Sequence, residues 1–514
     1  MQNLILCLCA LSITIGLTRC EQAGAAAVEG SATSAAATGD APFTTDWASL
    51  EKVKEDPEWF ADSKLGIYAH WGPYNVPDFG SEWYPRNMYI EGSKEFEFHK
   101  ETFGDQSEFN YHDFIPMFTA EKFDAEEWAQ LMQDAGAKWG GPVAQHHDGF
   151  AMWDSEINPW NAVKMGPKRD ITGELAEALR KRDMKLITSF HHARNLQRNA
   201  EDKEYWTGWD SHFPYNPDWA TSATDEPTRW LYGNVPEEEW YPYWLGQLEE
   251  VIDKYDPDII WFDVWLNMIP EAHRQAFCAY YLNHAAEQGK EVVIAHKKDD
   301  LPLEVSILDI EQGGKKDVSE RVWLTDITLS NQSWSHVKGQ TYKDPKLVLR
   351  NFVDVISKNG IVLLNISPLA DGSIPQAQKD VLTEMGRWLK VHGEAIYGTR
   401  PRLEYGFGSA AVKDGKYGGQ TATIEYSASD VRFTESKDQK TIYVFFLGAP
   451  EQGKKVELKS MGPINYPPKF PIKRVTMLET GEEIDYVFNR HESSITLPNA
   501  PMNETVTVVK IEME

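Results

Sequence analysis

Carboxylate side chains follow two short apolar runs of the sequence, where they suit nucleophilic or acid–base chemistry. Asp263 closes the run Ile259–Phe262. Asp309 and Glu311 follow the run Val305–Leu308. Hydrolysis of a glycosidic bond uses two carboxyl groups, one as nucleophile or base and the other as proton donor. Asp263 suits the nucleophile, because an apolar strand holds a carboxylate rigidly and shields it from water. The alternative, a helix cap, is disfavoured because the residue after Asp263 begins no helical pattern.

The proton donor is marked less clearly than the nucleophile. Glu311 and Asp309 follow the same run and, by strand alternation, point to one face, so both are candidates. Glu304 and Glu320 are weaker candidates. Glu82 precedes an aromatic pair and looks more like a hydroxyl-binding residue. Each of these side chains can equally be a solvated surface carboxylate, so these alternatives stay open.

Histidines gather at other places where apolar runs end. His70, His146 and His147 are candidate zinc ligands, because histidines at the strand ends of a barrel often bind that metal. The pattern disfavours zinc, since His70 is followed by Trp71 and has no second histidine one residue away. Consecutive histidines in a strand also point to opposite sides. Hydrogen bonding to sugar hydroxyls uses the same residues without an ion, and we expect neither a metal nor a cofactor.

Short β-rich runs alternate with helical patterns from about residue 55 to 395, which is typical of a parallel sheet wound with helices. Seven runs are clear. With an eighth that the pattern does not show, they favour a (β/α)₈ barrel over an open sheet. Polar residues follow the runs, as expected if the strand ends converge on one catalytic face. The runs are 66–69, 142–144, 185–188, 259–262, 292–294, 305–308 and 361–364, and the residues that follow include His70, His146, His147, His191, His192, Asp263, His296, Asp309, Glu311 and Asn365.

Other stretches mark insertions and a second domain. Two long polar insertions, about 86–118 and 198–245, are rich in aromatic residues and are expected to frame the pocket. After residue 400 the pattern changes to strands and turns, which predicts an antiparallel β-sandwich. Its strands are expected at 422–426, 431–433, 441–446, from 475 onward and at 505–509. The predicted domains are therefore a catalytic barrel over 46–398 and a C-terminal β-sandwich over 399–514.

Composition and the first residues restrict the class of protein and its location. The formal net charge of −28 disfavours binding to nucleic acid. Residues 1–22 are predicted to be a signal peptide, with a weak likeness to the lipoprotein type at Cys20, and 23–45 a flexible linker. We therefore expect an exported protein, either periplasmic, extracellular or a cell-surface lipoprotein, without a transmembrane segment. Cys278 is the single cysteine after the leader, so no internal disulfide is expected.

Taken together, these motifs resemble those of the α-L-fucosidases of glycoside hydrolase family twenty-nine. The likeness covers about residues 55–450 in the order of that family. The matching stretches include His70-Trp71-Gly72, Glu82-Trp83-Tyr84, Ala135-Gly136-Ala137-Lys138, His146-His147-Asp148-Gly149-Phe150, Trp261-Phe262-Asp263, Lys358-Asn359-Gly360, Leu363-Leu364-Asn365-Ile366 and Gly393-Glu394-Ala395-Ile396-Tyr397-Gly398-Thr399.

The resemblance implies a barrel with a C-terminal β-sandwich and hydrolysis with retention through a covalent fucosyl-enzyme, without a metal. It implies that Asp263 is the nucleophile, and Glu311 is the nearest counterpart of the acid/base. The partner is then a fucosylated oligosaccharide or polysaccharide, with sulfated glycans left open. The residues implied to contact or surround the sugar are His70, Glu82, Trp83, His146, His147 and Trp261.

Departures from the family pattern concern the acid/base and the aglycone side. Glu311 precedes Trp323 and lies in no diagnostic motif. The stretch 190–195 replaces a tyrosine-containing strand end, so His192 and Arg194 are expected to line the pocket in a way particular to this chain. Two other functions stay open, namely a carbohydrate-binding protein without turnover and a barrel glycosidase specific for another sugar.

Overall fold

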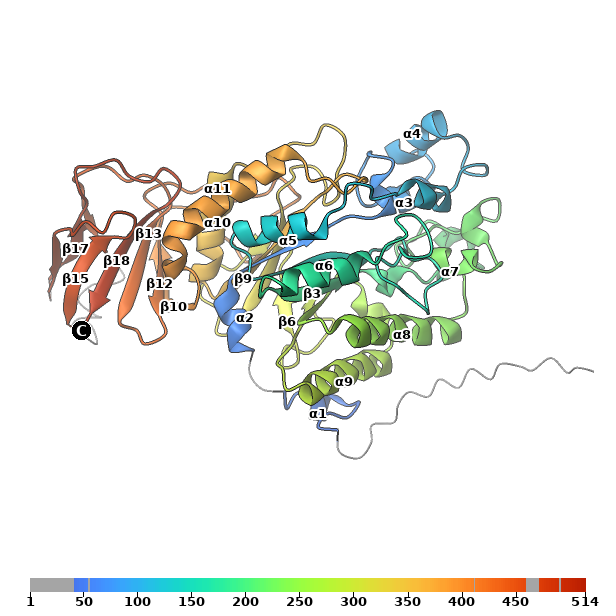
Figure 1. Ribbon diagram of the computed structural model, residues 1–514, viewed down its shortest axis with the longest axis horizontal. Coiled ribbons are helices and arrows are strands. Elements are labelled where there is room, and N and C mark those ends of the chain that lie inside the picture. Colours follow the sequence, from blue (N-terminus) through green and yellow to red (C-terminus); the bar gives the residue numbers. More distant parts are fainter. Residues whose placement is uncertain (1–40, 54–55, 411, 459–470, 490) are drawn as a thin grey trace, which may run out of the picture. The chain divides into compact units, whose positions relative to one another are not determined.

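Eight parallel strands close into a barrel in the order in which they occur along the chain (Figure 1). The computed structural model describes residues 41–53, 56–410, 412–458, 471–489 and 491–514. The predicted fold class, a (β/α)₈ barrel followed by antiparallel β-structure, is confirmed. The barrel strands are β1 (Leu65–Ala69), β2 (Trp139–Gln145), β3 (Lys185–Phe190), β4 (Ile259–Phe262), β5 (Val293–Lys297), β6 (Ile307–Asp309), β8 (Trp323–Thr328) and β9 (Gly360–Ile366).

The strand that the sequence pattern did not reveal is β8. Its segment Trp323–Thr328 carries Asp326 near its centre, which interrupts the apolar run expected of a buried strand. Parallel pairing with β9 nevertheless runs the whole length of β8, from Trp323 opposite Gly360 to Thr328 opposite Asn365. Closure of the barrel places Asp326 in the interior, where it is 1 % exposed. The residue that hides β8 in the sequence pattern, Asp326, is thus a polar side chain inside the barrel.

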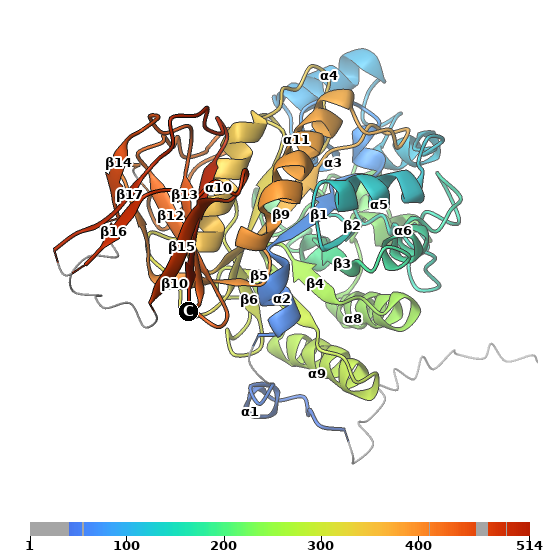
Figure 2. The same ribbon diagram turned by 60° about the vertical axis from the view of Figure 1, so that its left-hand side comes forward.

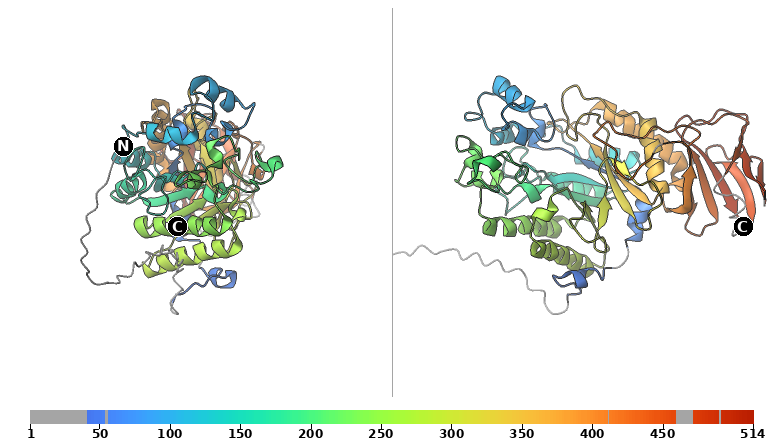
Figure 3. Two further views of the ribbon diagram at one scale, coloured as in Figure 1. Left: turned by 90° about the vertical axis from the view of Figure 1, so that its right-hand side faces the viewer. Right: turned by 180° about the vertical axis from the view of Figure 1, so that it is seen from behind.

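Amphipathic helices surround the barrel strands (Figure 3). Aspartates cap several of them: Asp124 accepts from the amides of Glu126 and Glu127, and Asp170 accepts from that of Gly173. These two aspartates precede α5 and α6. The helices are α1 (Trp47–Leu50), α2 (Glu58–Ser63), α3 (Tyr84–Asn87), α4 (Lys94–Thr102), α5 (Ala125–Asp134), α6 (Ile171–Arg180), α7 (Thr228–Tyr232), α8 (Glu237–Tyr255), α9 (Glu271–Glu287), α10 (Pro345–Ser357) and α11 (Gln376–His392).

Two hydrophobic cores follow from strand alternation. One set of side chains packs inside the barrel, including Tyr68, Ile187 and Trp261. Their sequence neighbours point outward and pack beneath the helices, as Leu186 and Phe262 do. Side chains alternate along a strand, so every second residue after an inward-pointing one also points inward, up to the strand's C-terminal end. This rule decides which polar side chains enter the site.

Glycines in β1 and β2 let neighbouring strands approach closely. A Cβ atom on Gly141 would lie 1.8 Å from the carbonyl oxygen of Ile187 in β3, and one on Gly66 would lie 2.2 Å from the ring of Trp139. Backbone at the first of these contacts has no room to move, because it belongs to the closed barrel. A side chain at Gly141 is therefore excluded by packing rather than by its backbone angles.

The two polar insertions lie at one end of the barrel, around α3 and α4 and around α7 (Figures 1 and 3). The first insertion contains α4, and the second is mostly short turns before α7 and α8. Among the described residues, no helix is both long and apolar enough to cross a membrane.

The C-terminal region consists of two antiparallel sheets that share one core. A five-stranded sheet has the order β10-β12-β13-β18-β15, and a three-stranded sheet has the order β14-β17-β16. Side chains from both sheets, such as Phe433 and Ile495, belong to the same hydrophobic cluster. The strands are β10 (Thr399–Phe407), β12 (Val431–Ser436), β13 (Thr441–Phe446), β14 (Lys455–Glu457), β15 (Ile472–Met477), β16 (Tyr486–Phe488), β17 (Ser493–Thr496) and β18 (Thr507–Met513).

The larger sheet packs against the barrel helix α10 (Figure 2). Asp354 of α10 makes a buried ion pair with Arg432 of β12 at 2.5 Å and another with Lys358 at 2.7 Å. The strand predicted at 422–426 does not form. Instead, the amide and carbonyl of Ile424 bond to the side chain of Asn351 in α10, so no strand partner takes these backbone groups.

A short pairing connects the C-terminal region to the mouth of the barrel. Strand β11 (Gly415–Lys416) pairs with β7 (Gly313–Gly314), which follows β6.

The end of the predicted linker also has a defined place, since the amide and carbonyl of Phe43 bond to Asn283 of α9 at 3.0 and 2.8 Å. The predicted signal peptide, and the linker as far as residue 40, lie outside the described residues.

We predict that Gly141→Ala lowers the free energy of unfolding by about 3 kcal/mol, because the new methyl group overlaps the backbone of β3. Thermal and urea denaturation measure the change. Gly419→Ala is the matched control, because nothing lies within 4 Å of a Cβ atom there, and it should change stability by less than about 0.5 kcal/mol. Equal stability of the two variants would contradict this account of the close strand contact.

Candidate active site

A cavity of about 490 Å³ opens at the C-terminal ends of the barrel strands. Residues within or shortly after seven of the eight barrel strands supply much of its lining. Two loops beyond the barrel, at 80–83 and at 416–420, also contribute side chains. The lining is Tyr68, His70, Gly80, Ser81, Glu82, Trp83, Lys94, Glu95, His146, His147, His191, Trp261, Asp263, Val264, Trp265, Lys297, Glu311, Asp326, Gln332, Trp334, Lys416 and Gln420.

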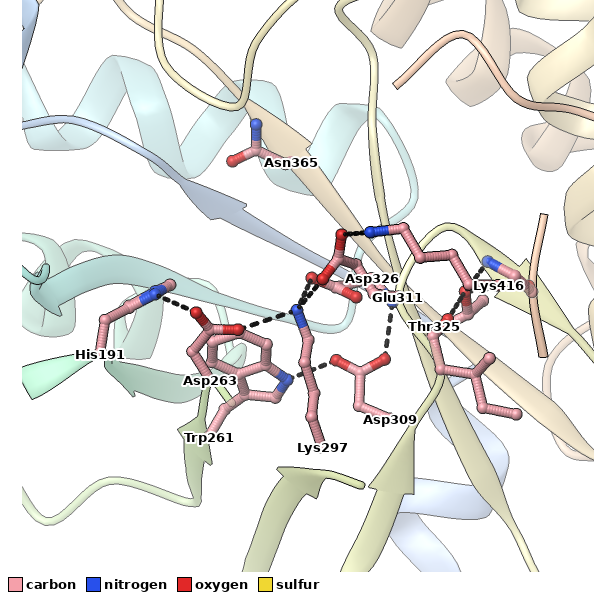
Figure 4. A network of polar contacts seen from close by, with 12 residues as sticks. His191, Trp261, Asp263, Lys297, Asp309, Glu311, Thr325, Asp326, Asn365 and Lys416 are labelled. Atoms are coloured by element: carbon pink, nitrogen blue, oxygen red, sulfur yellow. Dashed lines mark hydrogen bonds and ion pairs between the residues drawn. The ribbon is translucent and has the colours of Figure 1, made fainter. Parts of the chain in front are cut away.

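Asp263, directly after β4, lies among three side chains that favour its ionised form (Figure 4). One carboxylate oxygen is 3.1 Å from Nζ of Lys297. The other is 3.3 Å from Nε2 of His147 and 3.2 Å from Nδ1 of His191. Burial by itself raises the pKa of Asp263, but the charge of Lys297 and the two histidine contacts outweigh it and hold this pKa well below its usual value. The side chain is still 12 % exposed, so an ionised carboxylate faces the cavity.

Lys297 connects the carboxylates of the site. Its ammonium lies 3.0 Å from Oε2 of Glu311 and 3.1 Å from Oδ2 of Asp326, in addition to Asp263. Burial alone lowers the pKa of Lys297, but these carboxylates raise it well above the usual lysine value. Asp263 and Glu311 thus contact one shared cation from two directions, which brings them close together. Such a pair suits the short separation found in retaining glycosidases, about 5–5.5 Å.

Glu311 faces the cavity and is 23 % exposed. The charge of Lys297 lowers its pKa, with burial and Asp263 opposing and Lys416 assisting. Lys416 of β11 pairs with its second oxygen, so the C-terminal region holds this carboxylate from the outer side. In the free protein, therefore, Glu311 releases its proton more readily than an ordinary glutamate.

Asp309 and Asp326 have different surroundings from Glu311. Asp309 accepts from Nε1 of Trp261 at 2.6 Å and from the amide of Asp326 at 2.9 Å, and it does not line the cavity. Burial raises its pKa to about 6. Burial and the neighbouring Asp309 raise the pKa of Asp326 well above its usual value. Asp309 is thus held in the wall, where it orients Trp261, while Asp326 borders the cavity beside Lys297.

Of the remaining carboxylate candidates, only Glu82 lines the cavity. Glu304 is exposed at a separate cleft, and Glu320 is exposed as well. Glu82 is buried at the cavity, where it accepts from Oγ of Ser333 at 3.0 Å and from the amide of Trp334 at 3.1 Å. Burial raises the pKa of Glu82. Its position among cavity side chains suits binding of a hydroxyl group.

Neutral histidines form the inner wall of the cavity. Burial lowers the pKa of His70 and His146 well below the usual value and that of His147 to about 4. Nδ1 of His70 donates to Oδ1 of Asn365 at 2.7 Å, which leaves Nε2 free to accept. Uncharged imidazoles can both donate to and accept from hydroxyl groups. His70, His146 and His147 therefore form a polar wall suited to a sugar.

The prediction that His192 lines the pocket is wrong, because the neighbouring His191 does so. Ile187 of β3 points into the barrel, so the inward positions that follow are 189 and 191. His192 points outward, stacks on Trp244 at 5.6 Å and lies with Nε2 3.4 Å from the carbonyl of that residue. Arg194 is fully buried and does not line the cavity either.

The same parity rule would have found two further residues that sequence analysis missed. Val293 and Ala295 of β5 point inward, so Lys297 enters the site and His296 faces the helices. Leu324 of β8 points inward, so Asp326 does too. Trp265, with a φ of +77°, turns back over the cavity just after the nucleophile candidate.

Two groups of side chains in the described part of the chain could supply ligands to a metal ion. They are His70 with His146 and His191, and His147 with His191 and Asp263, each with ligand atoms within 4.8 Å of one another. Both groups line the sugar-sized cavity itself and overlap the wall just described. The same nitrogen and oxygen atoms can donate to and accept from the hydroxyl groups of a sugar without an ion.

The chain is similar to proteins of one known family. The family model for α-L-fucosidase matches residues 31–394. Tissue α-L-fucosidase of Rattus norvegicus is 30 % identical over 497 residues, covering 91 % of this chain and 92 % of that one. Plasma α-L-fucosidase of Homo sapiens is 29 % identical over 427 residues, covering 80 % of each chain.

Solved structures show the same likeness. The α-fucosidase of Thermotoga maritima in complex with fucose is 28 % identical, with a TM-score of 0.69, and the match covers 91 % of this chain and 100 % of that one. Because the family model spans the barrel and the relatives match along most of their length, this chain belongs to the α-L-fucosidase family of glycoside hydrolases.

Proposed function

We propose that this protein is an exo-acting, retaining α-L-fucosidase that releases terminal α-L-fucosyl residues from glycans by double displacement. The observation that carries the proposal is the ionised Asp263, which shares Lys297 with Glu311 at the wall of one polar cavity. The fucose seen in the related Thermotoga enzyme supports the choice of sugar. Fucose presents three ring hydroxyls to the histidines and Glu82, and a methyl group to aromatic side chains such as Trp261.

In the first step, a carboxylate oxygen of Asp263 attacks the anomeric carbon while the bond to the leaving oxygen breaks. The reacting form is the one in which Glu311 is protonated: Glu311 gives its proton to that oxygen, and a covalent fucosyl ester of Asp263 forms. The negative charge of Asp263 raises the pKa of Glu311, and formation of the ester removes that charge, so the pKa of Glu311 falls. This keeps Glu311 ionised as the base of the second step.

In the second step, Glu311 takes a proton from water, and the resulting oxygen attacks the anomeric carbon. The ester bond breaks, fucose leaves with its original anomeric configuration, and Asp263 and Glu311 return to their starting states. His147 and His191 lie on the oxygen of Asp263 that is remote from Lys297, where they orient the carboxylate for both displacements.

The substrate in this proposal is a fucosylated oligosaccharide or polysaccharide. Export from the cytoplasm also belongs to the proposal and is supported by the apolar run near the start of the chain. A carbohydrate-binding protein without turnover is disfavoured, because both carboxyl groups needed for hydrolysis border the cavity.

Asp263→Gly is expected to lower kcat on an aryl α-L-fucoside by about 10³-fold or more, because no other ionised carboxylate replaces the nucleophile. Azide should restore part of the activity by entering the vacated space. Glu304→Gln is the control, since Glu304 lies at a separate cleft. Proton NMR of the first sugar released should show retention. Turnover of Asp263→Gly at the wild-type rate, or an inverted product, would refute the mechanism.

Glu311→Gln is expected to slow substrates with poor leaving groups by about 10²- to 10³-fold and activated aryl fucosides much less, because only poor leaving groups need a proton donor. Steady-state kinetics across a series of aryl and sugar leaving groups measures the contrast. Asp326→Asn provides the comparison at a neighbouring carboxyl group. Equal slowing of all substrates by Glu311→Gln would remove the role from Glu311.

Lys416→Met is expected to move the basic limb of the kcat/KM profile to higher pH. The cation of Lys416 contributes to the lowered pKa of Glu311, so its removal lets Glu311 keep the donated proton at higher pH. Lys297 and Asp263 still face Glu311 in this variant. Lys94→Met serves as the control, since Lys94 borders the cavity but pairs with Glu95. A basic limb that stays in place or moves to lower pH would contradict the assignment.

A further inference from the structure

Trp209 is an exposed tryptophan next to the cavity. Its side chain is 63 % exposed, and its ring meets Trp83 edge-on at 5.9 Å. Trp83 lines the cavity and packs against His147 at 5.2 Å, and His147 contacts Asp263. A row of rings thus leads outward from the nucleophile candidate, through His147 and Trp83, to Trp209 at the surface.

Two buried arginines hold the loop that carries Trp209. Arg194 donates from Nε to the carbonyl of Trp209 at 2.7 Å and from an outer nitrogen to the carbonyl of Ser211 at 3.0 Å. Arg86 donates to four carbonyls of the same loop, at 207, 208, 211 and 212, over 2.7–3.0 Å. The backbone on both sides of Trp209 is therefore fixed although its side chain is exposed.

The same guanidinium groups also lie against the Trp209 ring. Arg86 is 4.9 Å and Arg194 is 5.0 Å from the ring centroid, and Arg194 is 4.4 Å from that of Trp265 at the cavity. If the Trp209 ring only covered the two arginines, it would not need to expose so much of its own surface to solvent. An aromatic face that is both open and held in place suits a ligand, because little side-chain freedom is lost on binding.

We propose that Trp209 is the platform on which the sugar next to the terminal fucose stacks. The proposal rests on the fucosidase function above, in which the fucose occupies the cavity and its neighbour must lie at the mouth. A pyranose ring has an apolar face of C–H groups that packs on an aromatic ring. The expected ligand is therefore an uncharged pyranose of the aglycone, and Trp209 determines preference for the glycan rather than for fucose.

The test compares a substrate that has an aglycone sugar with one that has none. The fucosylated oligosaccharide that the wild type cleaves best is compared with α-L-fucosyl fluoride, whose leaving group has no ring. Trp209→Ala should lower the ratio of kcat/KM for the oligosaccharide to that for the fluoride about tenfold, a factor that corresponds to about 1.4 kcal/mol. Tyr205→Ala is the matched control, since Tyr205 is 48 % exposed in the same insertion, and its ratio should stay within about twofold of wild type.

A binding measurement covers the case in which the alanine variant folds poorly. In an Asp263→Asn background, calorimetry with the intact oligosaccharide and with free fucose should show that Trp209→Phe weakens binding of the oligosaccharide more than that of fucose. Failure of the wild type to hydrolyse the fluoride would overturn the proposed function itself. Hydrolysis of the fluoride by the wild type, with unchanged ratios in the Trp209 variants, would overturn the platform alone.

Discussion

The buried ammonium of Lys297 is the interaction on which the site depends. It lies 3.0–3.1 Å from oxygens of Asp263, Glu311 and Asp326, in a region where none of these charges could exist alone without a large desolvation penalty. Loss of the cation would leave carboxylates facing one another across the cavity. One positive charge therefore allows a barrel interior to hold the proposed nucleophile and the proposed proton donor close to each other.

The surroundings of each carboxyl group then separate their pKa values. Contacts with Lys297, His147 and His191 hold Asp263 ionised, whereas burial beside Asp309 raises the pKa of Asp326. Such separation lets chemically similar carboxyl groups in one cavity differ in protonation state. The pKa of Glu311 is the most open to change among these groups, because its side chain is partly exposed and its partner Lys416 comes from a different part of the chain.

The barrel supplies the reacting groups, and peripheral segments supply the mouth. The insertion at 198–245 carries Trp209, whose loop is held by Arg86 and Arg194. The pairing of β11 with β7 brings Lys416 to Glu311. Strands fix geometry to a fraction of an ångström and loops vary without disturbing them. The residues proposed for catalysis and the residue proposed to set glycan preference thus lie on different parts of the chain, so either set can vary without the other.

Local patterns in the sequence determined the barrel, the strand-end position of Asp263 and the antiparallel C-terminal region, because strand alternation and apolar runs depend on neighbouring residues. The apolar pattern does not reveal strand β8, because Asp326 interrupts it. Which of His191 and His192 faces the cavity depends on the alternation of β3, in which Ile187 points inward. Only the tertiary structure decided that Lys297 contacts three carboxylates and that Lys416 pairs with Glu311, 105 positions away. These contacts depend on barrel closure and on strand register between distant segments, which no local pattern encodes.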